Sequence, residues 1–228
     1  FKVVDKDGNP APAGTITVSP ATEITPPGTY TATLTGEKAG EYTVIPQYND
    51  SAVGSLDEKI ELKADETPDA GQGNSTIAAA PKSIAADNTA MSTLTFTAKD
   101  KKGNPITDLT AVTFVVKDAS GNVPTSGITV SATTNAGNGT YTATLNGTLA
   151  GTYTVTPSNN GAAVGSLSDT VTLTAGTTPN ASLSTFSADP GAIIPDGQDS
   201  ATLTLHLQDS YGNAITGLTN VTFAATPA

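Results

Sequence analysis

The stretch GTYTATL occurs at residues 28–34 and returns unchanged at residues 139–145. The match continues in register, because AGEYTV at residues 39–44 returns as AGTYTV at residues 150–155. Similarity at a fixed spacing is typical of proteins built from repeated structural units. This repeat is about 110 residues long, too long for a solenoid unit and suited to a whole β-sandwich domain.

A second pair of matches reveals a third copy of the repeat. DKKGN at residues 100–104 is matched by DSYGN at residues 209–213, and Phe114 is matched by Phe223. Phe1 then takes the place of Phe114 in the first copy. The copies therefore number three, and only the middle one is complete.

Joints rich in Pro, Gly and Asn set the expected boundaries of the copies. The sequence predicts the C-terminal part of a module over residues 1–66, a joint over 67–74 and a complete module over 75–175. A second joint follows at residues 176–181, and the N-terminal part of a third module occupies residues 182–228. Pro68 and Pro179 should make these joints stiffer than Gly/Ser linkers.

Short alternating runs of apolar residues, separated by turn signals every eight to twelve residues, predict the fold class. We expect an all-β chain of tandem immunoglobulin-like β-sandwiches in an elongated string, each a Greek key of about seven to eight strands. No stretch of 12 or more residues shows helical periodicity. The recurring tyrosines could form an aromatic binding surface, but their alternation favours packing. The predicted packing residues are Tyr30, Tyr42, Tyr141, Tyr153, Phe96 and Phe114.

Composition excludes several classes of function. The chain has no Cys, so it can hold neither a disulfide nor a cysteine zinc site. Its basic residues are all Lys, and its net charge is -11, which disfavours nucleic acid as a partner. No run of about 18 apolar residues could span a membrane as a helix. No signal peptide is visible, so the chain reads as an excised segment.

KDKKGNP at residues 99–105, GTYTATL at residues 139–145 and AGTYTV at residues 150–155 resemble the bacterial Ig-like repeats of the intimin/invasin family. The resemblance covers essentially the whole chain. It implies an extracellular adhesin in which an outer-membrane β-barrel, absent here, anchors a string of such domains on a Gram-negative cell. The string would project a distal tip that binds a host receptor or glycan.

The chain offers no constellation of acid, base and nucleophile, so we expect no enzyme. His206 is the only histidine, and it lies in an alternating strand where the middle copy has Thr97. A surface position is the stronger interpretation of this residue. No cofactor is expected, and the expected partners are the neighbouring modules of the same chain.

Calcium is the one metal that the sequence suggests. DKDGN at residues 5–9 resembles the start of an oxygen-rich calcium loop, but no glutamate follows at the bidentate position, which favours an ordinary turn. Acidic residues near the joints could instead share Ca²⁺ between modules. The candidate ligands are Asp189, Asp196 and Asp199 after the second joint, with Asp65, Glu66 and Asp69 at the first.

Two functions follow from these observations. A stalk or spacer would gain reach from the number of its modules and stiffness from its short joints. A binding module would instead contact a host protein or glycan through the loops at one end of a sandwich. The incomplete ends fit a window cut from a longer fibre, or modules completed head to tail between chains.

Overall fold

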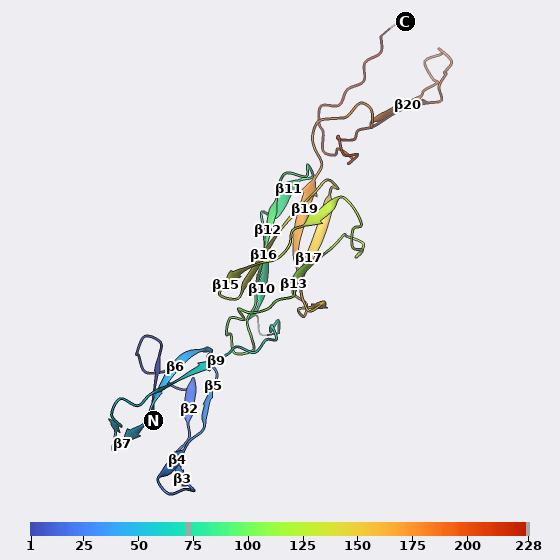
Figure 1. Cartoon of the computed structure of the whole chain (residues 1–228). Helices are drawn as coiled ribbons and strands as arrows, with labels where there is room; N and C mark the ends of the chain where they lie inside the picture. Colours follow the sequence, from blue (N-terminus) through green and yellow to red (C-terminus); the bar gives the residue numbers. More distant parts are fainter. Residues whose placement is uncertain (72–73, 227–228) are drawn as a thin grey trace. The chain divides into compact units, whose positions relative to one another are not determined.

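The structure is a computed structural model that describes residues 1–71 and 74–226 (Figure 1). Gln72 and Gly73 of the first expected joint, and the last two residues of the third copy, lie outside the described residues. Within the described ranges the regular structure consists of β-strands, with no helix. The all-β prediction is therefore confirmed.

The chain divides into two compact units. The first contains Phe1–Thr76, Phe96–Ala111 and Asn135–Tyr141, and the remaining segments form the second. The boundary runs through the middle copy, so each unit combines one end of that copy with its neighbour. Each of the two joints consequently lies inside a single unit.

The middle copy is a two-sheet sandwich. One sheet has the order β10-β12-β16-β14, with β15 also pairing with β16, and the other has the order β11-β19-β17-β13, with β18 also pairing with β17. The first sheet contains β10 (Thr76–Ala80), β12 (Ser92–Thr97), β16 (Thr140–Gly147), β14 (Ile128–Val130) and β15 (Thr134–Gly137). The second contains β11 (Ser83–Ala85), β19 (Asp169–Thr174), β17 (Gly151–Asn159), β13 (Val112–Lys117) and β18 (Ala162–Ala163).

The alternation in the sequence becomes the core of this sandwich, because successive side chains of a strand point to opposite faces. In β16, Tyr141, Ala143 and Leu145 are buried while the threonines between them are partly exposed. Leu94 and Phe96 of β12, which pairs with β16 in the sheet, are fully buried, and so is Ala98 just after β12. The other predicted packing residues of this copy, Phe114 and Tyr153, are also buried.

Gly139 shows why the repeated stretch begins with glycine. It follows Asn138 in the turn between β15 and β16, and both residues have positive φ, 73° and 51° respectively. A Cβ atom on Gly139 would lie 2.7 Å from the carbonyl oxygen of Ala98. Glycine therefore allows both the turn and the close approach of these two backbones.

The first copy repeats part of this arrangement. Its three-stranded sheet β1-β6-β9 matches β13-β17-β19, and Tyr42 is buried in it as Tyr153 is in the middle copy. The sheet consists of β1 (Lys2–Asp5), β6 (Gly40–Ile45) and β9 (Glu58–Leu62). Two-stranded pairs are formed by β2 (Ile16–Val18) with β5 (Leu34–Gly36), β3 (Thr22–Ile24) with β4 (Thr29–Thr31), and β7 (Gln47–Tyr48) with β8 (Ser51–Ala52).

Tyr30 departs from the packing prediction, because it is 61% exposed whereas its counterpart Tyr141 is 1% exposed. The ring of Tyr141 lies beside Phe96, and its hydroxyl group contacts the backbone of residues 106–109. Among the described residues, Tyr30 has no ring contact or side-chain hydrogen bond of this kind. Tyr30 therefore has the strand position that the repeat predicts, but its ring is not covered.

The third copy contributes β20 (Thr185–Asp189) and β21 (Thr202–His206), an antiparallel pair that corresponds to β10 and β12. The rings of Phe186 and Phe223 stack with their centroids 5.7 Å apart. His206 ends β21 with its side chain exposed, as expected for a surface residue.

Replacing Tyr141 by phenylalanine should lower the free energy of unfolding by about 1–2 kcal/mol. The Tyr141 hydroxyl group donates to the carbonyl oxygen of Ile106 (3.0 Å) and accepts from the N–H of Leu109 (2.9 Å), so both would lose a partner. Urea denaturation followed by circular dichroism measures the change. The matched variant Tyr30→Phe alters an exposed ring and should stay within about 0.5 kcal/mol; equal losses in both would contradict this assignment.

Candidate functional site

A turn of sequence Asp-x-x-Gly-Asn occurs four times, at residues 5–9, 100–104, 118–122 and 209–213. In each turn the aspartate Oδ1 atom accepts a hydrogen bond of 2.9 Å from the backbone N–H of the asparagine. The glycines have φ values from 79° to 84°, a region that other residues rarely adopt. Residues 5–9, which resemble a calcium loop in sequence, therefore form the same turn as the other three copies.

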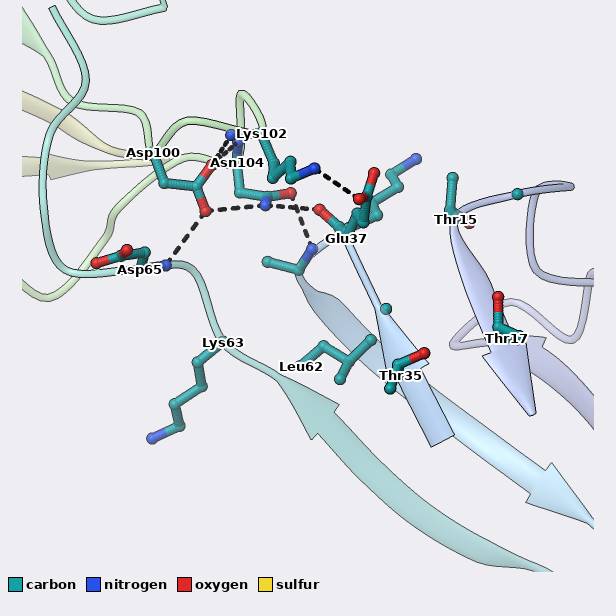
Figure 2. A pocket seen from close by; sticks show the side chains of 14 residues that line it. Thr15, Thr17, Thr35, Glu37, Leu62, Lys63, Asp65, Asp100, Lys102 and Asn104 are labelled. Atoms are coloured by element: carbon teal, nitrogen blue, oxygen red, sulfur yellow. Dashed lines mark hydrogen bonds and ion pairs between the residues drawn. The ribbon is translucent and has the colours of Figure 1, made fainter. Parts of the chain in front are cut away.

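At the first joint, Asn104 connects its turn to the loop before β6. Its Oδ1 accepts from the N–H of Ala39 and its Nδ2 donates to the carbonyl oxygen of Glu37, both at 2.9 Å. Nδ2 also donates to Oδ2 of Asp100 at 2.9 Å, and this oxygen accepts from the N–H of Asp65 at 3.2 Å. Figure 2 shows the chain of interactions, all within the first unit.

The second joint repeats these contacts within the second unit. The Oδ1 of Asn213 accepts from the N–H of Ala150 (2.7 Å), and its Nδ2 donates to the carbonyl oxygen of Thr148 (2.8 Å). Oδ2 of Asp209 accepts from the N–H of Gly176 at 2.9 Å. Every group occupies the position equivalent to its counterpart at the first joint.

We call each of these Asp/Asn pairs a latch: Asp100 with Asn104, and Asp209 with Asn213. All four residues are buried, with exposed fractions of 4%, 9%, 3% and 6% in that order. The Asp118 carboxylate, in contrast, accepts from Ser120 and Asn122 of its own turn. The same local turn thus serves either as a latch or as an isolated loop, depending on what lies against it.

Both latch aspartates are held in their charged form. Burial acts to raise the pKa of Asp100, but hydrogen bonds from Asn104, Asp65 and Lys102 outweigh it and lower the pKa below its ordinary value. The pKa of Asp209 is lowered in the same way, by Asn213, Gly176 and Tyr211 acting against burial. A carboxylate that accepts several N–H groups loses these bonds when it takes up a proton.

The joints should therefore loosen in acid. Since the pKa of each latch aspartate is lower in the folded protein, its contribution is complete above the unfolded value of about 3.9 and disappears as the pH falls through the lowered pKa. Distances between spin labels on either side of a joint should be narrowly distributed at neutral pH and broaden as acid protonates the latch aspartates. Narrow distributions at about pH 1 would show that ionised aspartates are not needed.

The position before the latch glycine differs between the two joints. At the first, Nζ of Lys102 lies 2.5 Å from Oε1 of Glu37, and both side chains are more than half exposed. At the second, the hydroxyl group of Tyr211 donates to the carbonyl oxygen of Asp87 at 3.1 Å. An exposed ion pair contributes only about 0–1 kcal/mol, so these contacts adjust a joint that the latch forms.

A polar groove of about 520 Å³ lies beside the first latch and is drawn in Figure 2. Leu62 of β9 and Thr35 of β5 are among its lining residues. In the middle copy the residue equivalent to Leu62 is Leu173, and β11 lies alongside it. Among the described strands, β9 is the edge of its sheet, so the groove marks a strand position left open in the first copy.

The calcium candidates Asp189, Asp196 and Asp199 are not brought together as a metal site. Among the described residues, no three His, Cys, Asp or Glu side chains form a group that could hold a metal ion. Asp196 accepts the N–H groups of Gln198 and Asp199, and Asp199 accepts the N–H of Ile194. Asp87 caps a turn in the middle copy as Asp196 does in the third.

The latch residues were visible in the sequence only as landmarks of the repeat. The aspartate and asparagine are kept in all four turns while the two residues after the aspartate change, so the sequence does not distinguish the latches from the other turns. In the part of the chain that the structure describes, no helix is long and apolar enough to cross a membrane.

Comparison with known proteins shows which proteins this chain is similar to. Residues 71–176 match the family model described as "Invasin, domain 3". The chain is 29% identical over 198 residues to the inverse autotransporter adhesin YeeJ of Escherichia coli K12, which covers 84% of the chain but only 8% of YeeJ.

Two solved structures are similar over most of the chain. The Escherichia coli adhesin FdeC matches with a TM-score of 0.62 and 28% identity, over 89% of this chain and 61% of that one. Invasin, described as a bacterial integrin-binding protein, matches with a TM-score of 0.57 and 30% identity, over 96% of this chain and 44% of that one. Residues 71–176 thus match the invasin domain 3 family, and the chain as a whole is similar in sequence and structure to the immunoglobulin-like domains of invasin-type adhesins.

Proposed function

We propose that this chain is a stalk segment of a bacterial surface adhesin, which holds a distal binding domain away from the cell. The adhesin role is supported by the family and by relatives that are themselves named adhesins. The stalk role rests on one observation: the same buried latch occurs at both joints. The complete module would occupy residues 75–175, and the parent protein would be anchored in the outer membrane by another part.

Each latch resists bending because it attaches at two separate places. Asn104 contacts the loop at Glu37 and Ala39, whereas Asp100 contacts Asp65, which follows β9. Bending that moves the latch away from either place must break the hydrogen bonds made there. Three hydrogen bonds at about 0.5–1.5 kcal/mol each would keep the joint closed for most of the time. The partners of each module are then its neighbours in the same chain.

Spin labels on either side of a joint test this function. The chain has no native cysteine, so Ser55→Cys with Thr134→Cys would report on the first joint and Thr134→Cys with Ser187→Cys on the second. All three positions are exposed. A stalk predicts a narrow distance distribution in both pairs by double electron–electron resonance. Broad distance distributions in both label pairs would contradict the proposal.

The alternative is a module that itself binds a host protein or glycan through its end loops. Invasin's description as an integrin-binding protein keeps this alternative open for the family. Specific adhesion of the isolated chain to host cells, lost when the loops of the middle copy are exchanged, would favour it over the stalk. We propose neither a catalytic role nor a nucleic-acid partner for this segment.

A further inference from the structure

The two sides of each latch differ in chemistry. The module that follows a joint contributes side chains, namely an aspartate and an asparagine. The module that precedes it contributes only backbone: the carbonyl oxygen of Glu37 and the N–H groups of Ala39 and Asp65 at the first joint. The second joint uses the equivalent backbone groups of Thr148, Ala150 and Gly176.

The side chains on the preceding module play no part in these bonds, and two of the three differ. Glu37 corresponds to Thr148 and Asp65 to Gly176, yet the donor and acceptor pattern offered to the latch is the same. The latch therefore binds backbone groups whose positions depend on the path of the chain. The identity of the side chains at these positions does not affect the bonds.

A tyrosine hydrogen bond that occurs in both preceding modules fixes the path of this backbone. The hydroxyl group of Tyr42 donates to the carbonyl oxygen of Lys38 (3.1 Å), and that of Tyr153 donates to the carbonyl oxygen of Leu149 (2.9 Å). Each tyrosine thereby fixes the position of the residue that lies between the two that the latch contacts, which is Lys38 in the first copy and Leu149 in the middle copy. The backbone surface is thus formed inside the preceding module, before any latch reaches it.

We infer that the Asp-x-x-Gly-Asn latch is a docking surface for the backbone of any preceding module of this type, including modules that are not neighbours in this chain. The inference rests on the proposed stalk function and adds that the order of modules does not matter to the joint. Lys102 and Tyr211, which differ between the joints, would modify a joint without deciding whether it forms.

A chain with residues 66–176 duplicated in tandem tests the inference. Its new joint presents the backbone of Thr148, Ala150 and Gly176 to Asp100 and Asn104, a pairing that the original chain lacks. Hydrogen exchange would be followed by mass spectrometry on a peptide that contains Ala150. The two copies yield the same peptide, so two equally protected joints give one slowly exchanging isotopic envelope.

The expected result is one slowly exchanging envelope for the peptide that contains Ala150, with the same exchange rate as in the original chain. Two envelopes of equal intensity, one exchanging about tenfold faster, would overturn the inference, because the new joint alone would be open. As a control, Asn104→Ala in the second copy of the duplicated chain should produce those two envelopes. If the control leaves the envelope single and slow, the latch does not protect Ala150 and the inference also fails.

The spin-label experiment separates this result from the stalk proposal. Narrow distance distributions combined with two exchange envelopes would leave the stalk intact and remove only the interchangeability of its modules. Broad distributions combined with a single slow envelope would remove the stalk and leave the docking surface in place.

Discussion

Replacing Asp100 by alanine should open the first joint while the middle sandwich remains folded. The Asp100 carboxylate accepts hydrogen bonds from the N–H groups of Asp65, Lys102 and Asn104 and from Nδ2 of Asn104. Alanine removes all of these and leaves the Asn104 side chain without the partner that orients it. The free energy holding the joint closed should fall by about 2–4 kcal/mol, since bonds to a charged group are the stronger ones.

The measurement is the distance distribution between labels at Ser55→Cys and Thr134→Cys, which should change from narrow to broad. Asp118→Ala is the matched control, because Asp118 has the same role within its turn but its carboxylate bonds stay inside that turn. It should leave the distribution at the first joint narrow. If both variants broadened it equally, the effect would come from a damaged turn and not from the latch.

The sequence predicted the sandwich well, because its signals are local. Phe96 and Ala98 are fully buried as their alternation indicated, and Val171 and Leu173 face the same interior from β19. Alternation assigns a face to each residue of a strand. Because GTYTATL occurs at residues 28–34 and again at residues 139–145, the sequence also shows which strands are present in both copies.

The joints could not be predicted in the same way. Asn104 bonds to Ala39 and Glu37, which lie 65 and 67 residues earlier in the chain. Local chemistry makes four turns of one kind, and only tertiary contact decides which of them are buried. Tyr30 also shows that a local pattern does not determine burial. It shares the strand pattern of Tyr141 but is exposed.

Replacing Phe96 by alanine should have the largest effect on the stability of the middle sandwich. Phe96 is fully buried, and its ring centroid lies 6.3 Å from that of Tyr141. The chain has no Trp, a single Met and only five Phe, so its cores depend on few large side chains. Removing this ring should lower the free energy of unfolding by about 3–5 kcal/mol through lost burial and the cavity that remains.

Urea denaturation followed by circular dichroism measures this loss, with Thr93→Ala as the control in the same strand. Thr93 is exposed, so that variant should stay within about 0.5 kcal/mol of the original chain. With no cysteine in the chain, no disulfide can hold the weakened module together. The first latch lies just beyond the end of β12, so it should open only when the module unfolds. Release of the joint in Phe96→Ala while circular dichroism still reports folded strands would show instead that core packing sets the position of Asp100.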